Sequence, residues 1–90
     1  MTWEIRWRDK ARKEFLKLDK PVQRRIAHFL IDRVAKLADP RDMGKPLVGE
    51  KGEIWRYRVG NYRLLCQIDD GKLTVLVVGV GHRKHIYRNR

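Results

Sequence analysis

Apolar and charged residues alternate at the start of the chain and then change to a helical spacing. The alternating apolar residues are Trp3, Ile5 and Trp7. This period of two predicts a strand. The next apolar residues are spaced as on one face of a short helix: Ala11, Phe15 and Leu18. We expect Asp9 to cap that helix, because a short acidic side chain accepts from the first free backbone amides.

A second helix is predicted from Pro21, because proline favours the first turn of a helix. One helical stripe carries its apolar residues: Val22, Ile26, Phe29, Leu30, Val34 and Leu37. Ile31 lies outside this stripe, so it either touches a partner or is simply exposed. Asp39-Pro40 ends the helix. Residues 40–52 hold three glycines and two prolines, which predicts an irregular connector.

The period returns to two after the connector and predicts three strands. They span residues 54–59, 62–68 and 73–80, with tight turns at Gly60-Asn61 and Asp70-Gly71. The order is therefore β-α-α-β-β-β. We predict one domain over residues 1–90 with an α+β fold, in which two N-terminal helices pack on one face of a small, mostly antiparallel sheet.

The Gly60-Asn61 turn decides which side chains share a face of the sheet. If these two residues form the loop, Arg58 lies opposite Arg63 and Tyr57 lies opposite Leu64. The apolar set then faces the helices: Trp55, Tyr57, Val59, Tyr62, Leu64 and Cys66. Three arginines point the other way, and we call this side of the sheet the arginine face: Arg56, Arg58 and Arg63.

The Asp70-Gly71 turn extends the same argument to the last strand. It places one set toward the helices: Leu73, Val75 and Val77. It places the other set on the arginine face: Thr74, Leu76, Val78 and Val80. The three arginines would then be flanked by apolar side chains.

The chain is strongly basic, with 22 Lys and Arg against 11 Asp and Glu and a net charge of +11. Such a charge fits nucleic acid, an acidic protein or a membrane surface. Like charges opposed on a sheet destabilise it, within a range of about 0.2–1 kcal/mol, and neither strand holds an acid to offset Arg58 and Arg63. A solvated arginine surface is one interpretation; an RNA backbone with a stacked base, or an acidic peptide, are the others.

The basic residues also suit one kind of chemistry. Phosphodiester transfer needs cations for the phosphate, an acceptor for the 2′-hydroxyl proton and a donor to the leaving 5′-oxygen. Candidates for the cations are Arg56, Arg58, Arg63 and Arg83. Candidates for proton transfer are His82, His85 and Tyr87. The single cysteine, Cys66, excludes a cysteine-based zinc site, and the only acidic pair in this half is Asp69-Asp70, so we expect no metal and no cofactor.

Membrane and export signals are not expected. The longest apolar run covers nine residues, 73–81, far below the ~20 that a membrane helix needs. The first residues, MTWEIRWRDK, carry charge too early for a signal peptide. We therefore expect a cytoplasmic protein with no membrane partner.

Several segments, in this order and spacing, resemble the RelE/ParE superfamily of bacterial toxins, and the RelE side most closely. The segments are residues 11–18 (ARKEFLKL), 57–65 (YRVGNYRLL), 68–71 (IDDG) and 80–88 (VGHRKHIYR). The resemblance covers nearly the whole chain. It implies a RelE-like fold and a toxin of a type II toxin–antitoxin pair.

The resemblance also implies an activity and partners. RelE-type members bind the ribosomal A site and cleave mRNA there without metal. Their site residues would fall here on Arg56, Arg58, Arg63, Arg83 and Tyr87. The implied partners are the 70S ribosome, mRNA and a cognate acidic, RelB-like antitoxin that covers the arginine face, with no direct DNA binding by the toxin alone.

The sequence departs from the best-known RelE members at three places. Two lysines of those members are Arg56 and Arg58 here, and arginine does not deprotonate, so Arg58 cannot accept a proton. A connector arginine falls on Val48, and Tyr87 follows Arg83 more closely. Two alternatives therefore stay open: a ParE-like toxin that inhibits DNA gyrase without nuclease activity, and a simple RNA-binding module.

Overall fold

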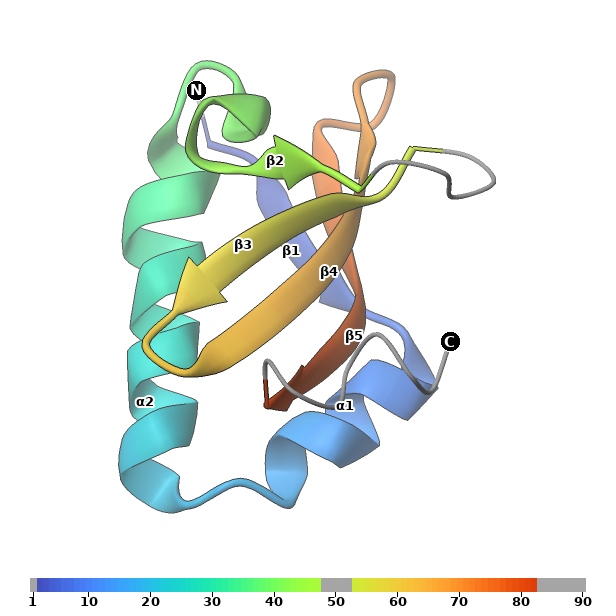
Figure 1. The fold of residues 1–90 in the computed structure, drawn as a ribbon. Helices are drawn as coiled ribbons and strands as arrows, with labels where there is room; N and C mark the ends of the chain where they lie inside the picture. Colours follow the sequence, from blue (N-terminus) through green and yellow to red (C-terminus); the bar gives the residue numbers. More distant parts are fainter. Residues whose placement is uncertain (1, 48–52, 83–90) are drawn as a thin grey trace.

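The computed structural model describes residues 2–47 and 53–82 and has the predicted α+β fold. The helices are α1 (Asp9–Leu16) and α2 (Lys20–His28). The strands are β1 (Glu4–Trp7), β2 (Lys45–Pro46), β3 (Trp55–Val59), β4 (Tyr62–Asp69) and β5 (Thr74–His82). They form one sheet in the order β1-β5-β4-β3-β2, in which β1 is parallel to β5 and the other pairs are antiparallel (Figure 1).

The helices begin and end partly as predicted. Pro21 lies in the first turn of α2. The prediction for Asp9 was wrong: α1 begins at Asp9 with Arg8 as its N-cap, and no side chain caps it. A carboxylate inside the first turn still interacts favourably with the helix dipole. Asp9 therefore supports the helix from within its first turn.

The apolar stripe of the second helix is preserved through a change in helix type. α2 continues as a π-helical segment, η1 (Phe29–Arg33), and a 3₁₀ turn, η2 (Val34–Lys36). A π-helical turn inserts an extra residue and so shifts the phase of a helical stripe. Ile26, Leu30 and Val34 are fully buried, whereas Ile31 is 56% exposed.

The core lies between the helices and one face of the sheet. Its buried residues come from every layer: Trp3, Ala11, Ile26, Leu30, Val34, Ala35, Tyr57, Leu64, Cys66, Val75, Val77 and Val80. Trp7 of β1 packs on Phe15 of α1, with ring centroids 4.7 Å apart. The core fixes which face of the sheet is left for function, since the helices cover only one.

The connector is more ordered than predicted. A 3₁₀ turn, η3 (Pro40–Met43), leads into β2, which pairs with the outer edge of β3. The backbone amide of Arg41 donates to Asp39 Oδ1 at 3.0 Å and starts the turn. The expectation of an irregular segment was therefore wrong for residues 40–46, because a two-residue strand is too short to show periodicity. Residues 48–52 lie outside the described residues.

The first hairpin has the predicted register. Arg58 pairs with Arg63, Tyr57 with Leu64 and Val59 with Tyr62. Gly60 takes a φ of +59°, which glycine adopts at no steric cost. Arg56, Arg58 and Arg63 therefore share the arginine face, and the aromatic set faces the helices.

The second hairpin corrects three predictions. Its loop is residues 70–73, longer than Asp70-Gly71. Leu73 lies in this loop with a φ of +48° and is 37% exposed, so it does not join the strand residues that face the helices. Leu64 pairs with Val80 and Cys66 with Val77, so β5 has one extra residue, a β-bulge, at this point. Val80 consequently lies on the helix side, 4% exposed, and not on the arginine face.

Candidate functional site

Four basic residues lie together at the β2–β3–β4 corner of the arginine face. Arg58 and Arg63 are direct cross-strand partners, and Lys45 pairs with Arg56. Because paired residues point to the same face, Lys45 joins the three predicted arginines. Lys45 was missed in the sequence, since no pattern marks a two-residue strand. Its only signal was its place between Gly44 and Pro46.

A small cavity of about 140 Å³ lies at this corner. Its lining residues are Met43, Lys45, Arg56, Tyr57, Arg58 and Arg63. No carboxylate is among the described residues that line it. Four cationic side chains around a small cavity without an acid create a strongly positive potential, which attracts an anion such as a phosphate.

Arg63 contributes a buried donor to this corner. Its Nη1 is buried and makes no hydrogen bond within the described part of the chain. Leaving a buried donor unpaired costs about 1–3 kcal/mol, and more for a charged group. A phosphate oxygen bound beside Arg63 would satisfy this nitrogen. The orphaned donor is therefore the sharpest indication of a ligand at the site.

A buried tyrosine holds the connector against the sheet and so positions Lys45. The Tyr57 hydroxyl donates to the carbonyl oxygen of Pro40 at 2.7 Å. A Cβ at Gly44 would lie 3.0 Å from the Tyr57 ring, so any other residue would force the ring or the connector to shift. Burial raises the pKa of the Tyr57 hydroxyl well above its usual range. Tyr57 therefore stays protonated and supports the site without transferring protons.

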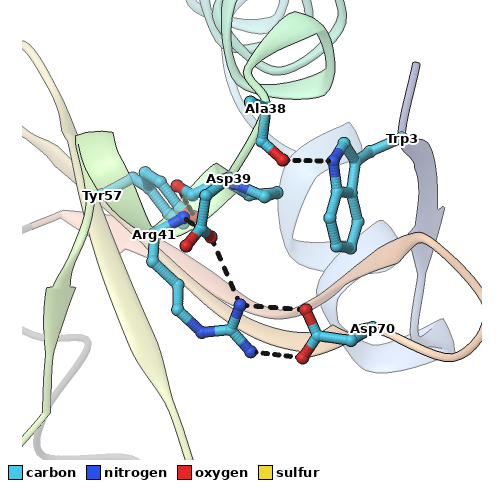
Figure 2. Close-up of polar contacts among 7 residues, drawn as sticks. Trp3, Ala38, Asp39, Arg41, Tyr57 and Asp70 are labelled. Carbon is cyan, nitrogen blue, oxygen red and sulfur yellow. Dashed lines mark hydrogen bonds and ion pairs between the residues drawn. The ribbon is translucent and has the colours of Figure 1, made fainter. Parts of the chain in front are cut away.

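A second anchor ties the same connector to the far hairpin (Figure 2). The Arg41 guanidinium donates to Asp70 at 2.7 and 3.1 Å and to Asp39 at 3.2 Å, and lies 5.8 Å from the centroid of Trp55. The hydrogen bond from Arg41 is the main reason that the pKa of Asp70 is lowered. Because ion pairs with two carboxylates neutralise its charge, Arg41 has a structural role and does not belong to the cationic corner.

The predicted proton-transfer residues are not assembled with the arginines in the described residues. His82 pairs with Tyr62, with ring centroids 5.8 Å apart, which places it on the helix side of the sheet. Arg83, His85 and Tyr87 lie outside the described residues. Burial raises the pKa of Cys66, so this thiol is no nucleophile.

Two further features concern the described residues as a whole. No helix there is long and apolar enough to cross a membrane. Among residues 2–47 and 53–82, no three or more His, Cys, Asp or Glu side chains gather as metal ligands.

An apolar groove of about 410 Å³ lies on the other side of the molecule, among β1, α1 and α2 with its η1 extension. Its lining includes Trp3, Ile5, Trp7, Phe15, Leu16 and Ile31. Leu16 is 57% exposed and Ile31 56% exposed. Large apolar side chains that stay exposed beside a groove mark a surface for a partner. This observation favours the interpretation that Ile31 touches a partner.

Comparison with known proteins identifies the class to which this fold and site belong. A family model described as the ParE toxin of type II toxin–antitoxin system, parDE, matches residues 5–87. The chain therefore belongs to the RelE/ParE superfamily of type II toxins.

Individual relatives lie on the RelE side. The chain is 34% identical over 88 residues to Toxin RelG of Mycobacterium tuberculosis, covering 98% of this chain and 99% of the relative. It is 33% identical to a putative RelE-like toxin protein of Escherichia coli over 87 residues, 93% of this chain and 86% of the relative. The toxin–antitoxin complex RelBE2 of M. tuberculosis matches with a TM-score of 0.83 and 31% identity, covering 92% and 93% of the two chains.

Proposed function

We propose that this toxin is a ribosome-dependent, metal-independent mRNA endoribonuclease that stops translation. The orphaned donor of Arg63, in a corner with Arg56, Arg58 and Lys45, carries the proposal, because it fits a phosphate. Two relatives, Toxin RelG and a putative RelE-like toxin protein, add support. The proposed target is mRNA in the A site of the 70S ribosome. The proposed site of action is therefore the cytoplasm.

The proposed reaction uses the substrate's own 2′-hydroxyl. Its oxygen attacks the adjacent phosphorus, the bond to the 5′-oxygen breaks, and a 2′,3′-cyclic phosphate forms. The hydroxyl loses a proton and the leaving oxygen gains one. The extra negative charge of the phosphorane would be stabilised by fixed guanidinium donors, Arg56, Arg58 and Arg63, together with Arg83.

Proton transfer is assigned to a residue that is not an arginine. Arginine stays protonated in proteins and cannot take the hydroxyl proton. His82 pairs with Tyr62 across the β4–β5 ladder, so its side chain lies on the same face as Tyr62 and away from the three arginines. The proposal therefore gives this role to Tyr87, which lies outside the described residues.

The proposal includes an acidic antitoxin as the natural partner. The matching structures from M. tuberculosis and from E. coli are complexes of a RelE-type toxin with RelB. A partner of opposite charge would neutralise the arginine face and block substrate there. An amphipathic segment of the same partner would cover the apolar groove beside Ile31. Such a partner would be encoded beside the toxin gene.

A second candidate function is inhibition of DNA gyrase. The matching family model bears the ParE name, and this observation favours it. The basic corner would then contact an acidic protein surface and perform no chemistry.

One experiment separates the two candidates. The purified toxin is added to ribosomes translating a defined message, and primer extension maps the message ends; in parallel, gyrase supercoiling is assayed. The nuclease proposal expects new ends inside the coding sequence, only when ribosomes are present. Intact message together with blocked supercoiling would replace it with the gyrase proposal. Cutting of free RNA would contradict the requirement for ribosomes.

A further inference from the structure

The proposed cleavage needs a proton donor for the leaving 5′-oxygen, and the arginines of the corner cannot supply the proton. When the bond between phosphorus and the 5′-oxygen breaks, the oxygen keeps the electron pair and leaves readily only if it gains a proton. A guanidinium keeps its proton in proteins, so Arg56, Arg58 and Arg63 offer charge and hydrogen bonds alone. The donor is therefore another kind of side chain.

The remaining side chains at the cavity leave one candidate. Met43 has no ionisable group, and the buried Tyr57 hydroxyl donates to the carbonyl oxygen of Pro40 at 2.7 Å. His82 lies on the opposite face of the sheet, beside Tyr62. An ammonium group releases its proton far more readily than a guanidinium does. Of the described residues that line the cavity, Lys45 is thus the one able to give a proton to a leaving oxygen.

Lys45 stands at the flank of the corner, on the far side of β3 from Arg63. It pairs with Arg56 across the β2–β3 ladder, whereas Arg63 belongs to β4 (Figure 1). Neighbouring strands are about 4.8 Å apart, so roughly 10 Å separates the backbones of β2 and β4. In an in-line displacement the leaving oxygen lies to one side of the phosphorus, opposite the attacking oxygen. A phosphate bound beside Arg63 can then present its leaving oxygen to Lys45.

The Lys45 side chain is available to a substrate, while its backbone is fixed. The side chain is exposed, and its ammonium makes no ion pair or hydrogen bond within the described part of the chain. On either side of it, the Gly44 amide donates to the Arg41 carbonyl at 3.0 Å and the Leu47 amide to the Ile54 carbonyl at 2.8 Å. A flexible side chain on a fixed backbone can follow the oxygen as the bond breaks.

We propose that Lys45 is the general acid of the cleavage reaction. As the bond between phosphorus and the 5′-oxygen breaks, the electron pair passes to the oxygen, which takes a proton from Lys45 Nζ and becomes a 5′-hydroxyl. The neutral amine then regains a proton from water. The proton of the 2′-hydroxyl leaves in a separate transfer to a base. The inference rests on the proposed nuclease function and adds a catalytic residue to it.

A message with sulfur in place of the leaving 5′-oxygen isolates this step, because a thiolate leaves without taking up a proton. Primer extension with the parent first locates the scissile linkage. Single-turnover cleavage is then measured on ribosomes that hold a message with either oxygen or sulfur at that linkage. Lys45→Arg keeps the positive charge but cannot give a proton, whereas Lys45→Ala removes both.

Two further variants are the controls. Arg63→Ala removes a donor to the phosphate and leaves Lys45 in place. Lys36→Arg makes the same exchange of lysine for arginine away from the corner, since Lys36 is an exposed residue of η2 whose Nζ lies 3.9 Å from Asp32. Thermal denaturation shows whether each variant is folded.

The two messages should respond differently to the loss of a general acid. Lys45→Arg should cut the oxygen message about 100-fold more slowly than the parent, since general acid–base catalysis contributes about 10²–10⁴-fold. It should cut the sulfur message at close to the parent's rate. Lys45→Ala should regain only part of its loss with sulfur, because it lacks the cation as well. Arg63→Ala should slow both messages alike, and Lys36→Arg should cut both like the parent.

The outcomes distinguish this inference from the proposed function. A folded Lys45→Arg variant that cuts the oxygen message like the parent would show that Lys45 contributes charge alone. An equal loss on both messages would show that it places the substrate and gives no proton. Either result overturns the inference, and the nuclease proposal stands. A parent that cuts neither message on ribosomes contradicts the proposed function itself, and the role of Lys45 falls with it.

Discussion

Arg63 combines two unfavourable features that a purely structural residue would avoid. It faces Arg58 directly across the hairpin, and its Nη1 is buried without a hydrogen bond in the described residues. Both features lower the free energy of unfolding, which is already small in a domain of this size. Local costs of this kind gather at functional sites. A bound phosphate would remove both, because it neutralises the pair and accepts from the orphaned nitrogen.

Arg63→Ala should therefore abolish cleavage while leaving the fold intact. Losing one fixed donor to a developing anion typically lowers a rate by about 10²–10³, or ~2.7–4 kcal/mol. The free energy of unfolding should stay the same or rise, since the repulsion with Arg58 is relieved. Primer extension on ribosome-bound message and thermal denaturation measure the two effects.

Arg33→Ala is the matched control for this experiment, because Arg33 is an exposed arginine of η1, remote from the arginine face. It should cut like the parent. An Arg63→Ala variant that also cuts like the parent would remove the main support for a phosphate site at this corner.

At the scale of elements, the site depends on how one short connector is held. η3 and β2 bring Lys45 to the arginines, and two anchors attach them to the sheet: Tyr57 to Pro40, and Arg41 to Asp70. Two-residue strands have almost no stability of their own, so these tertiary contacts decide where the connector lies. Neither anchor is one of the four basic residues of the corner, so both are testable without removing a cationic side chain of the site.

Tyr57→Phe should destabilise the domain by about 1–2 kcal/mol, because the carbonyl of buried Pro40 loses its donor while the ring still fills the core. Chemical denaturation measures this loss. Cleavage by the folded variant should weaken moderately, since Lys45 is less firmly placed. Unchanged stability would show that water replaces the hydroxyl and that the anchor is dispensable.

The Arg41–Asp70 anchor predicts a dependence of stability on pH. Arg41 lowers the pKa of Asp70 in the folded protein, so this contribution is present above the ordinary Asp value of about 3.9 and is lost as the pH falls through the lowered pKa. Asp70→Asn should therefore be less stable than the parent at pH 7, with a difference that shrinks toward pH 2. Denaturation curves at the two pH values measure it. A difference independent of pH would contradict the ion pair as its cause.

At the scale of the whole molecule, the charge of +11 sets how the toxin meets its partners. The Cα radius of gyration is 12.1 Å, so this charge is spread over a small surface. A compact cation attracts acidic chains and RNA over about one Debye length, ~8–10 Å at physiological salt. The helices cover the opposite face of the sheet, so we expect either kind of partner to meet the arginine face.

Association with an acidic antitoxin should therefore be strongly dependent on salt. We expect the association rate to fall by at least tenfold between 50 and 500 mM salt, as steering is screened, with a smaller change in the dissociation rate. Stopped-flow fluorescence measures both. An association rate that does not change with salt would mean that the apolar groove beside Ile31 determines the rate of association as well as the affinity.

The amino-acid sequence by itself determined the fold class, the first hairpin and the grouping of three arginines. Local signals were sufficient there: Gly60-Asn61 marks the turn, and strict alternation on both sides allows only one register. His82 lies on the other face of the sheet. Arg83, His85 and Tyr87 lie outside the described residues and remain predictions. Family membership was likewise readable from the order of short motifs.

Only the tertiary structure decided the remaining parts of the site. Lys45 reaches the arginines because η3 docks on Tyr57, and this contact joins residues 17 positions apart. The bulge in β5 places Val80 on the helix side and not on the predicted arginine face. Neither feature has a local signal, because each depends on contacts between elements that form only when the chain has folded.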